Sequence, residues 1–153
     1  INAGSYVEVT PQASKNIHAN PGDINVSLLK FSLKSDKKAY IKSLNFTMDK
    51  MAHSYDLKGL QLYVNNILAA ETPFFEGHAH LQNLLLKFNE NTSLPVEIRG
   101  YVSDQASPGD RIRLLLNGEN GIELTEENGE KLNVKTGLSL KGNVVSVIGR
   151  GPK

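Results

Sequence analysis

The residues best placed to do chemistry are two histidines, His78 and His80, separated by one alanine. Residues i and i+2 of a β-strand point to the same face, so both imidazoles could turn toward one metal ion, with Glu76 as a third ligand. A zinc site needs three or four ligands held by surrounding hydrogen bonds, and neither His18 nor His53 has a spacing that brings it to the pair. We therefore predict a solvated loop at the start of a strand and no metal site.

Acidic residues are the second class of reactive side chain, and they form no recognisable catalytic motif. The sequence lacks G-x-S-x-G and H-E-x-x-H motifs, and no calcium-loop pattern surrounds Asp49 or Asp56. Four glutamates cluster instead around one expected hairpin tip: Glu123, Glu126, Glu127 and Glu130. Because charges at such a tip usually keep it hydrated, we predict no catalytic residues, no cofactor and no enzymatic activity.

A more specific pattern of cationic and aromatic side chains lies in the stretch 93–116, which we interpret as a strand, a loop and a second strand. Apolar residues alternate with polar ones in both strands, which is the period of a half-buried β-strand. If the two strands form a hairpin, their polar residues share the outward face. That face would carry the candidate binding residues Arg99, Tyr101, Arg111 and Arg113, with Glu97 beside them.

Two interpretations of that face are open. Arginine can bind a carboxylate through two parallel hydrogen bonds, and tyrosine can stack on a sugar ring, which would make the face a small anion- or sugar-binding patch. Alternatively, the face is a hydrated sheet surface with a cross-strand contact between tyrosine and arginine. We favour the second interpretation, because such contacts are common on exposed sheets.

The same alternation recurs along the whole chain and indicates eight to ten short strands. One apolar run changes phase between Leu28 and Leu29, which is typical of a β-bulge or of a strand that passes from one sheet to another. Asn65-Asn66 between two apolar runs is typical of a two-residue hairpin. We expect one strand over 81–88 and no strand in the polar stretch 12–20.

No segment shows the helical period, so the sequence predicts an all-β fold. Pro-Gly-Asp occurs at 21–23 and 108–110, where each copy predicts a reverse turn. We expect a single antiparallel β-sandwich over residues 1–149, followed by a linker or tail at 150–153.

Composition bounds the function. The 153 residues carry 17 basic and 16 acidic side chains, a formal net charge of +1, which argues against nucleic-acid binding. Cysteine is absent, so disulfides and thiolate chemistry are excluded. No run of about 18 apolar residues occurs, so we predict no direct membrane insertion. Because the chain starts with Ile1, we expect a processed or excised piece of a longer protein.

Several segments in sequence order resemble immunoglobulin-like β-sandwich domains of bacterial cell-surface and S-layer-associated proteins. They are VEVTPQAS, NVSLLKFSLKS, AYIKSLNFTM, DLKGLQLYVNNILA, SLPVEIRGYVSDQASPGDRIRLLL and GLSLKGNVVSVIG, and they span nearly the whole chain. The Pro-Gly-Asp turns that lead into apolar strands are also similar to those of cohesins, which bind dockerins. The middle of the chain fits the cohesin pattern poorly, so we assign no dockerin-binding face to this chain.

The resemblance implies a non-enzymatic, extracellular structural or adhesive module. Its partners would be other domains of the same surface protein, or a surface protein or glycan. The alternative is a dedicated carbohydrate- or protein-recognition module, which would use the Arg99/Tyr101/Arg111/Arg113 face or the loop 74–80 as its contact.

Overall fold

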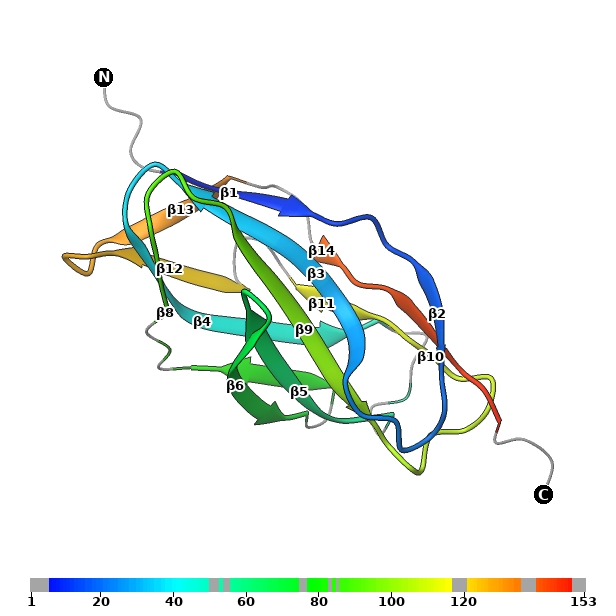
Figure 1. The fold of residues 1–153 in the computed structure, drawn as a ribbon. Coiled ribbons are helices and arrows are strands. Elements are labelled where there is room, and N and C mark those ends of the chain that lie inside the picture. The colour runs from blue at the N-terminus through cyan, green and yellow to red at the C-terminus, as the bar shows by residue number, and fades with distance from the viewer. Residues whose placement is uncertain are drawn as a thin grey trace.

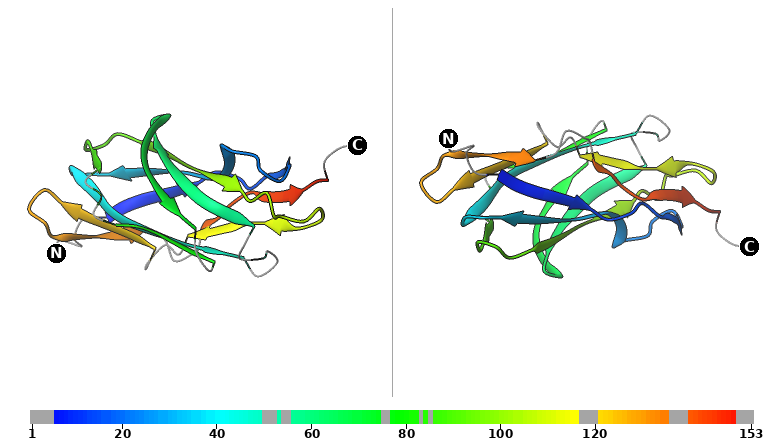
Figure 2. Two further views of the ribbon diagram at one scale, coloured as in Figure 1. Left: turned by 90° about the horizontal axis from the view of Figure 1, so that it is seen from below. Right: turned by 90° about the horizontal axis from the view of Figure 1, so that it is seen from above.

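The computed structural model describes residues 6–49, 53, 56–74, 77–82, 84, 86–116, 121–135 and 140–149, which form fifteen β-strands and no helix. Most strands belong to two layers, which Figures 1 and 2 show from three sides. The first layer has the order β1 (Tyr6–Pro11), β3 (Val26–Ser35), β9 (Leu94–Val102), β5 (Leu57–Val64) and β6 (Ile67–Pro73). All neighbours in this layer are antiparallel.

The second layer is built around β4 (Ala39–Met48). This strand pairs with β7 (His78–Leu81), β8 (Leu86–Phe88), β11 (Leu114–Leu116) and β12 (Ile122–Glu126). The layer continues from β12 to β13 (Lys131–Lys135) and from β11 to β14 (Leu140–Lys141). A smaller sheet places β15 (Val144–Val147) between β10 (Arg111–Ile112) and β2 (Asn16–Ala19).

Parallel pairing of β1 with β13 joins the two layers along one edge. Alternating side chains from both layers fill one apolar core, as in other sheet-on-sheet packings. Its largest fully buried members are Phe46, Leu28, Leu29, Leu33, Ile41, Leu44, Leu57, Leu60, Leu62, Ile98, Ile112 and Leu114. The predicted all-β sandwich is therefore confirmed.

Two local predictions are confirmed in detail. Leu28 and Leu29 are both buried, and the register of β3 against β9 shifts between Ser27 and Leu29, so the phase change marks a β-bulge. Asn65 and Asn66 have φ of 53° and 64° and close the β5–β6 hairpin. Positive φ at both central residues is the requirement of the turn that matches the twist of two strands.

The predicted hairpin over 93–116 is wrong. β9 lies between β3 and β5 in the first layer, whereas β10 pairs with β15 and β11 pairs with β4 and β14. The loop 103–110 therefore carries the chain from one sheet to another. Alternation in a sequence shows which face of a strand is buried, but it does not show which strand lies beside it. Two strands in opposite layers can both bury their apolar faces in the same core without pairing with each other.

Other predictions were wrong at the level of single strands. The polar stretch 12–20 contains β2, which pairs in parallel with β15, so the sandwich is not purely antiparallel. The expected strand over 81–88 is divided between β7 and β8. Short strands of this kind raise the number above the expected eight to ten. The predicted tail at 150–153 lies outside the described residues.

None of the described segments is a helix that is long and apolar enough to cross a membrane.

Candidate functional site

The outer surface of the first layer presents a continuous polar and aromatic face. The register places Lys30 opposite Glu97, and Glu97 opposite Tyr63. It also aligns Arg99 with Ser27 on β3 and with Gln61 on β5. We call this surface the β9 face and define it by Ser27, Lys30, Lys58, Gln61, Tyr63, Glu71, Glu97, Arg99 and Tyr101.

Arg99 and Tyr63 form the centre of the β9 face. The guanidinium carbon of Arg99 lies 3.9 Å from the centroid of the Tyr63 ring, within the range of a cation–π contact. Arg99 Nε also donates a hydrogen bond of 2.8 Å to Glu97 Oε1. These two contacts hold the guanidinium in place, while 27% of the Arg99 side chain stays exposed.

Glu97 is held by three partners from two strands. Its Oε2 accepts a hydrogen bond of 2.8 Å from Ser27 Oγ and lies 3.7 Å from Lys30 Nζ, while its Oε1 accepts from Arg99. Burial alone would raise the pKa of Glu97, but the hydrogen bonds from Ser27 and Arg99 and the charges of Arg99 and Lys30 lower it below its ordinary value. The carboxylate is therefore ionised and rigidly placed at neutral pH.

Tyr101 occupies the other end of the face and is 37% exposed. It lies opposite Gly59, and the Lys58 ammonium is 5.6 Å from its ring centroid. Lys58 also forms an ion pair of 3.4 Å with Asp104. Beside Tyr101 lies an open groove of about 440 Å³ along β5 and β6. It is lined by Lys58, Gly59, Leu60, Gln61, Glu71, Thr72, Pro73 and Tyr101.

A second groove lies on the same layer, toward β1. It has a volume of about 410 Å³, and Tyr63, Glu97 and Lys30 of the β9 face form part of its wall. Exposed Pro95 adds apolar surface. The lining is completed by Thr10, Pro11, Gln12, Ser32 and Asn66, and by the buried Phe31 and Val96 beneath it. The centre of the β9 face is thus flanked by concave surface on two sides.

The structure separates the four candidate binding residues that the sequence grouped together. Arg99 and Tyr101 lie on β9, but Arg111 is on β10, opposite Ser146 of β15. Arg113 follows β10, and its Nε donates a hydrogen bond of 3.1 Å to the carbonyl of Gly142. The expected four-residue patch on adjacent strands is therefore wrong, because Arg111 lies on a strand of the smaller sheet and Arg113 lies between β10 and β11. Binding by any of the four residues stays a prediction.

His78 and His80 lie on β7, and both side chains are exposed. Their rings stack with centroids 6.3 Å apart and an interplanar angle of 10°. His80 Nδ1 is 2.7 Å from Asn45 Oδ1 on the neighbouring strand β4. Glu76, the expected third ligand, lies outside the described residues.

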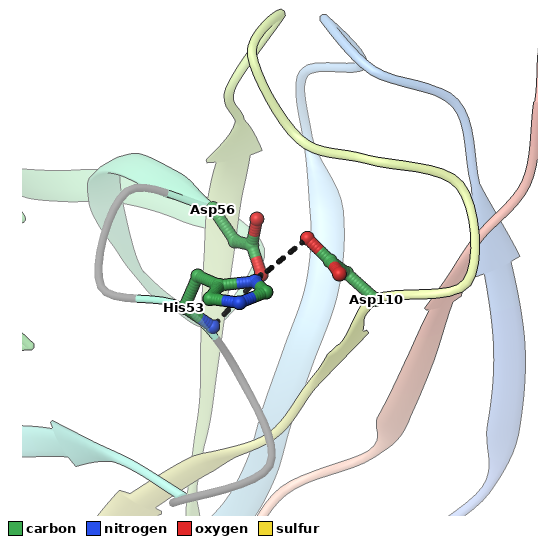
Figure 3. Close-up of side chains that lie close together, drawn as sticks. All are labelled: His53, Asp56 and Asp110. Carbon is green, nitrogen blue, oxygen red and sulfur yellow. Dashed lines mark hydrogen bonds and ion pairs between the residues drawn. The ribbon is translucent and has the colours of Figure 1, made fainter.

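A different histidine belongs to a cluster that the sequence did not predict. His53, Asp56 and Asp110 offer ligand atoms that all lie within 4.8 Å of one another, and Figure 3 shows the two carboxyl groups facing each other beside the imidazole. His53 Nδ1 is 3.1 Å from Asp110 Oδ2 and 3.9 Å from Asp56 Oδ2. Asp56 and His53 precede β5, whereas Asp110 ends the loop before β10.

Asp56 is the buried member of the cluster. Its side chain is fully buried, and its Oδ2 accepts a hydrogen bond of 3.1 Å from the backbone N–H of His53. Burial, followed by the hydrogen bond with Asp110, raises the pKa of Asp56 to about 6. Asp110 has the opposite tendency: burial would raise its pKa, but hydrogen bonds from Asp56 and His53 lower it.

No spacing rule connects these three residues. His53 and Asp110 are 57 positions apart, and they meet because the loop 103–110 crosses between sheets beside the start of β5. The backbone N–H of Ser103 donates to the carbonyl of Asp56 at 2.8 Å and fixes this neighbourhood. The one local signal was the Pro-Gly-Asp turn, which places Asp110 at its end.

No protein-family model matches the chain, and no curated protein matches its sequence. Solved structures do resemble it. One is a type I cohesin–dockerin complex from Clostridium thermocellum, in which the match covers 94% of this chain and 99% of that chain at 15% identity and a TM-score of 0.48. Another is a cohesin module of a family 33 glycoside hydrolase from Clostridium perfringens, with 95% and 99% coverage, 9% identity and a TM-score of 0.46.

A family 123 glycoside hydrolase from Clostridium perfringens gives a TM-score of 0.52 at 8% identity. This match covers 94% of the present chain and 27% of that chain, so the chain spans about a quarter of that hydrolase chain. At such identity the likeness concerns the fold alone.

Proposed function

We propose that the chain is a non-enzymatic recognition module that binds another protein through the β9 face. The observation that carries the proposal is the Arg99 guanidinium stacked on Tyr63 and tied to Glu97, on a sheet surface with a groove on either side. Arginine and tyrosine are the residue types that contribute most to binding energy at protein interfaces.

Preorganisation supports this role. An exposed arginine normally loses rotamer freedom when a partner binds, and this loss lowers affinity. Arg99 is already held by Glu97 and Tyr63, so a partner meets a fixed guanidinium whose remaining N–H groups can pair with a carboxylate. Exposed Pro95 beside it adds apolar surface that a partner can cover.

The proposal includes an extracellular place on a bacterial surface protein, which follows from the resemblance of the sequence segments. In Figure 1, β1 begins near one end of the long axis of the sandwich and the C-terminal strand β15 ends near the other, an arrangement that suits a module joined to neighbours at both ends. The cohesin of the Clostridium thermocellum complex binds a dockerin. For this chain the proposal rests on its own β9 face.

One observation favours a glycan as the alternative ligand. Tyr101 is exposed opposite Gly59, which has no side chain to cover the ring, and Gln61 and Glu71 line the groove beside it. An aromatic ring beside polar side chains is a surface on which a sugar can stack and form hydrogen bonds.

The experiment compares three immobilised forms of the chain: wild type, a variant with Arg99→Ala and Tyr101→Ala, and Arg111→Ala as the matched control. Each form is exposed to the secreted and surface proteins of the source bacterium and to a glycan array. We expect a protein that is retained by the wild type and by Arg111→Ala, and bound at least tenfold more weakly by the double variant.

A partner that the double variant binds as tightly as the wild type would place the contact elsewhere on the molecule. Saturable binding to a glycan, lost in the double variant, would support the alternative ligand and contradict a protein partner. Circular dichroism checks that each variant keeps the β-sandwich.

A further inference from the structure

The carboxyl group of Asp56 is buried in an unfavourable electrostatic environment. Its side chain is fully buried, and its Oδ1 is without a hydrogen-bond partner within the part of the chain that the structure describes. A buried carboxylate oxygen without a donor is costly. The carboxyl group also faces that of Asp110, so two acidic groups share one small space (Figure 3). A cation bound between the two carboxyl groups would offset their mutual repulsion and the cost of burying the Asp56 charge.

We propose that His53, Asp56 and Asp110 bind one divalent transition-metal ion of the zinc class. The donor set is one imidazole nitrogen and two carboxylates, a combination that suits Zn²⁺ or Co²⁺, whereas Ca²⁺ and Mg²⁺ prefer oxygen ligands alone. Among the described residues, this is the one group of three such side chains with ligand atoms this close together.

The observed separations fit such an ion. With metal–ligand bonds of about 2.0–2.2 Å, neighbouring ligand atoms lie about 3.0–3.5 Å apart and opposite ones about 4.2 Å. His53 Nδ1 is 3.1 Å from Asp110 Oδ2 and 3.9 Å from Asp56 Oδ2. Small side-chain adjustments therefore complete the coordination.

Backbone hydrogen bonds hold the described ligand residues in place. The N–H of Asp56 donates to the carbonyl of His53 at 3.0 Å, and the N–H of Val147 donates to the carbonyl of Asp110 at 2.8 Å. Asp110 Oδ2 also accepts from the N–H of Ser107 at 3.3 Å. A bound ion would thus connect the segment that precedes β5 with the turn that precedes β10, and three protein ligands leave further positions for water.

The test is titration of the metal-stripped chain with zinc chloride by calorimetry and with cobalt chloride by visible absorption. We expect one equivalent of each ion to bind, with Co²⁺ absorption bands typical of four or five ligands. A Zn²⁺ concentration of 100 times Kd should raise the midpoint of thermal unfolding by roughly 5–10 °C.

Two variants identify the ligands. His53→Ala removes a side chain that is 57% exposed, so it should not disturb folding, and Asp110→Asn keeps the shape of the carboxyl group. Both should weaken Zn²⁺ binding at least tenfold. The matched control is His78→Ala with His80→Ala, which removes the other histidine pair and should leave the affinity unchanged.

Three outcomes would overturn the proposal. The first is the absence of stoichiometric binding at millimolar Zn²⁺, which would mean that a proton alone relieves the contact between the two carboxyl groups. The second is unchanged affinity in His53→Ala and Asp110→Asn. The third is loss of binding in the control variant, which would assign the ion to His78 and His80.

Discussion

Glu97 is the residue whose charge organises the β9 face. It joins Ser27 and Lys30 of β3 to Arg99 of its own strand, and its side chain is 13% exposed. Surface ion pairs usually contribute little to stability, because water screens them and the side chains lose entropy. The ion pair of Glu97 with Arg99 differs, because the Glu97 carboxylate is shielded from water and accepts two hydrogen bonds of 2.8 Å, from Ser27 and Arg99.

The first prediction concerns the pH dependence that Glu97 gives to stability. Its pKa is lowered in the folded chain, so its contribution is present above the pKa of the unfolded chain and is lost as pH falls through the folded pKa. At pH 7 we expect Glu97→Gln to reduce the free energy of unfolding by about 1–2 kcal/mol. The difference from the wild type should shrink between about pH 5 and pH 3, as urea unfolding at several pH values will measure.

Glu127→Gln is the control for this prediction. Glu127 lies exposed in the β12–β13 hairpin turn, and its substitution should leave the pH profile parallel to that of the wild type. A difference between Glu97→Gln and wild type that stays constant from pH 7 to pH 3 would contradict the assigned pKa shift.

At the scale of elements, the β5–β6 hairpin depends on a turn that is not optimal. Asn65 and Asn66 both have positive φ, which asparagine tolerates and glycine adopts without steric cost. The second prediction is that Asn66→Gly raises the free energy of unfolding by about 0.5 kcal/mol, because Asn-Gly is the preferred pair in this turn. Asn66→Val should lower it by more than 1 kcal/mol, since a β-branched residue is disfavoured at positive φ. Thermal or urea unfolding measures both.

Asn89→Gly is the matched control, because Asn89 is exposed but is not among the residues with positive φ in the described structure. Glycine at that position should lower stability slightly, through the greater freedom of the unfolded chain. Equal effects of Asn66→Gly and Asn89→Gly would show that the turn geometry plays no part.

The elements also show what sequence patterns can and cannot predict. Alternation correctly placed Arg99 and Tyr101 on the outward side of β9, and the phase change correctly located the bulge at Leu28 and Leu29. Pairing partners were not predictable, because the period of a strand defines its buried face and contains no information on its neighbour. Arg111 was therefore assigned to the wrong surface.

The His53/Asp56/Asp110 cluster was missed for a related reason. Its members come from two loops, and loops have no period that fixes their relative position. Their meeting depends on the whole topology, in which the loop 103–110 passes beside the start of β5. Contacts of this kind can be found only once the sheet order is known.

At the scale of the whole molecule, residues 142 and 143 connect the two layers. The N–H of Gly142 donates to the carbonyl of Leu114 on β11, at 2.8 Å. The N–H of Asn143 donates to the carbonyl of Leu28 on β3, at 2.7 Å, and its side-chain Nδ2 donates to the carbonyl of Ser27 at 3.1 Å. Both carbonyls of β3 lie at its β-bulge, and the segment from the other layer donates hydrogen bonds to them.

The last prediction follows from the closeness of that crossing. Gly142 is buried, and a Cβ added there would collide with the carbonyl oxygen of Leu28 and lie 3.1 Å from that of Leu114. Both obstacles are backbone atoms, so Gly142→Ala must push the two layers apart and weaken the hydrogen bonds that join them. We expect a loss of about 2–3 kcal/mol in the free energy of unfolding by urea denaturation.

Gly149→Ala provides the comparison, because its added Cβ would meet only the Pro108 side chain, at 3.5 Å, which is an ordinary contact. This variant should lie within about 0.5 kcal/mol of the wild type. A Gly142→Ala variant as stable as the wild type would show that the layers can separate at this point without cost, and it would contradict the prediction. The crossing at Gly142 and Asn143 therefore predicts that glycine-to-alanine substitution lowers the free energy of unfolding strongly at Gly142 and only slightly at Gly149.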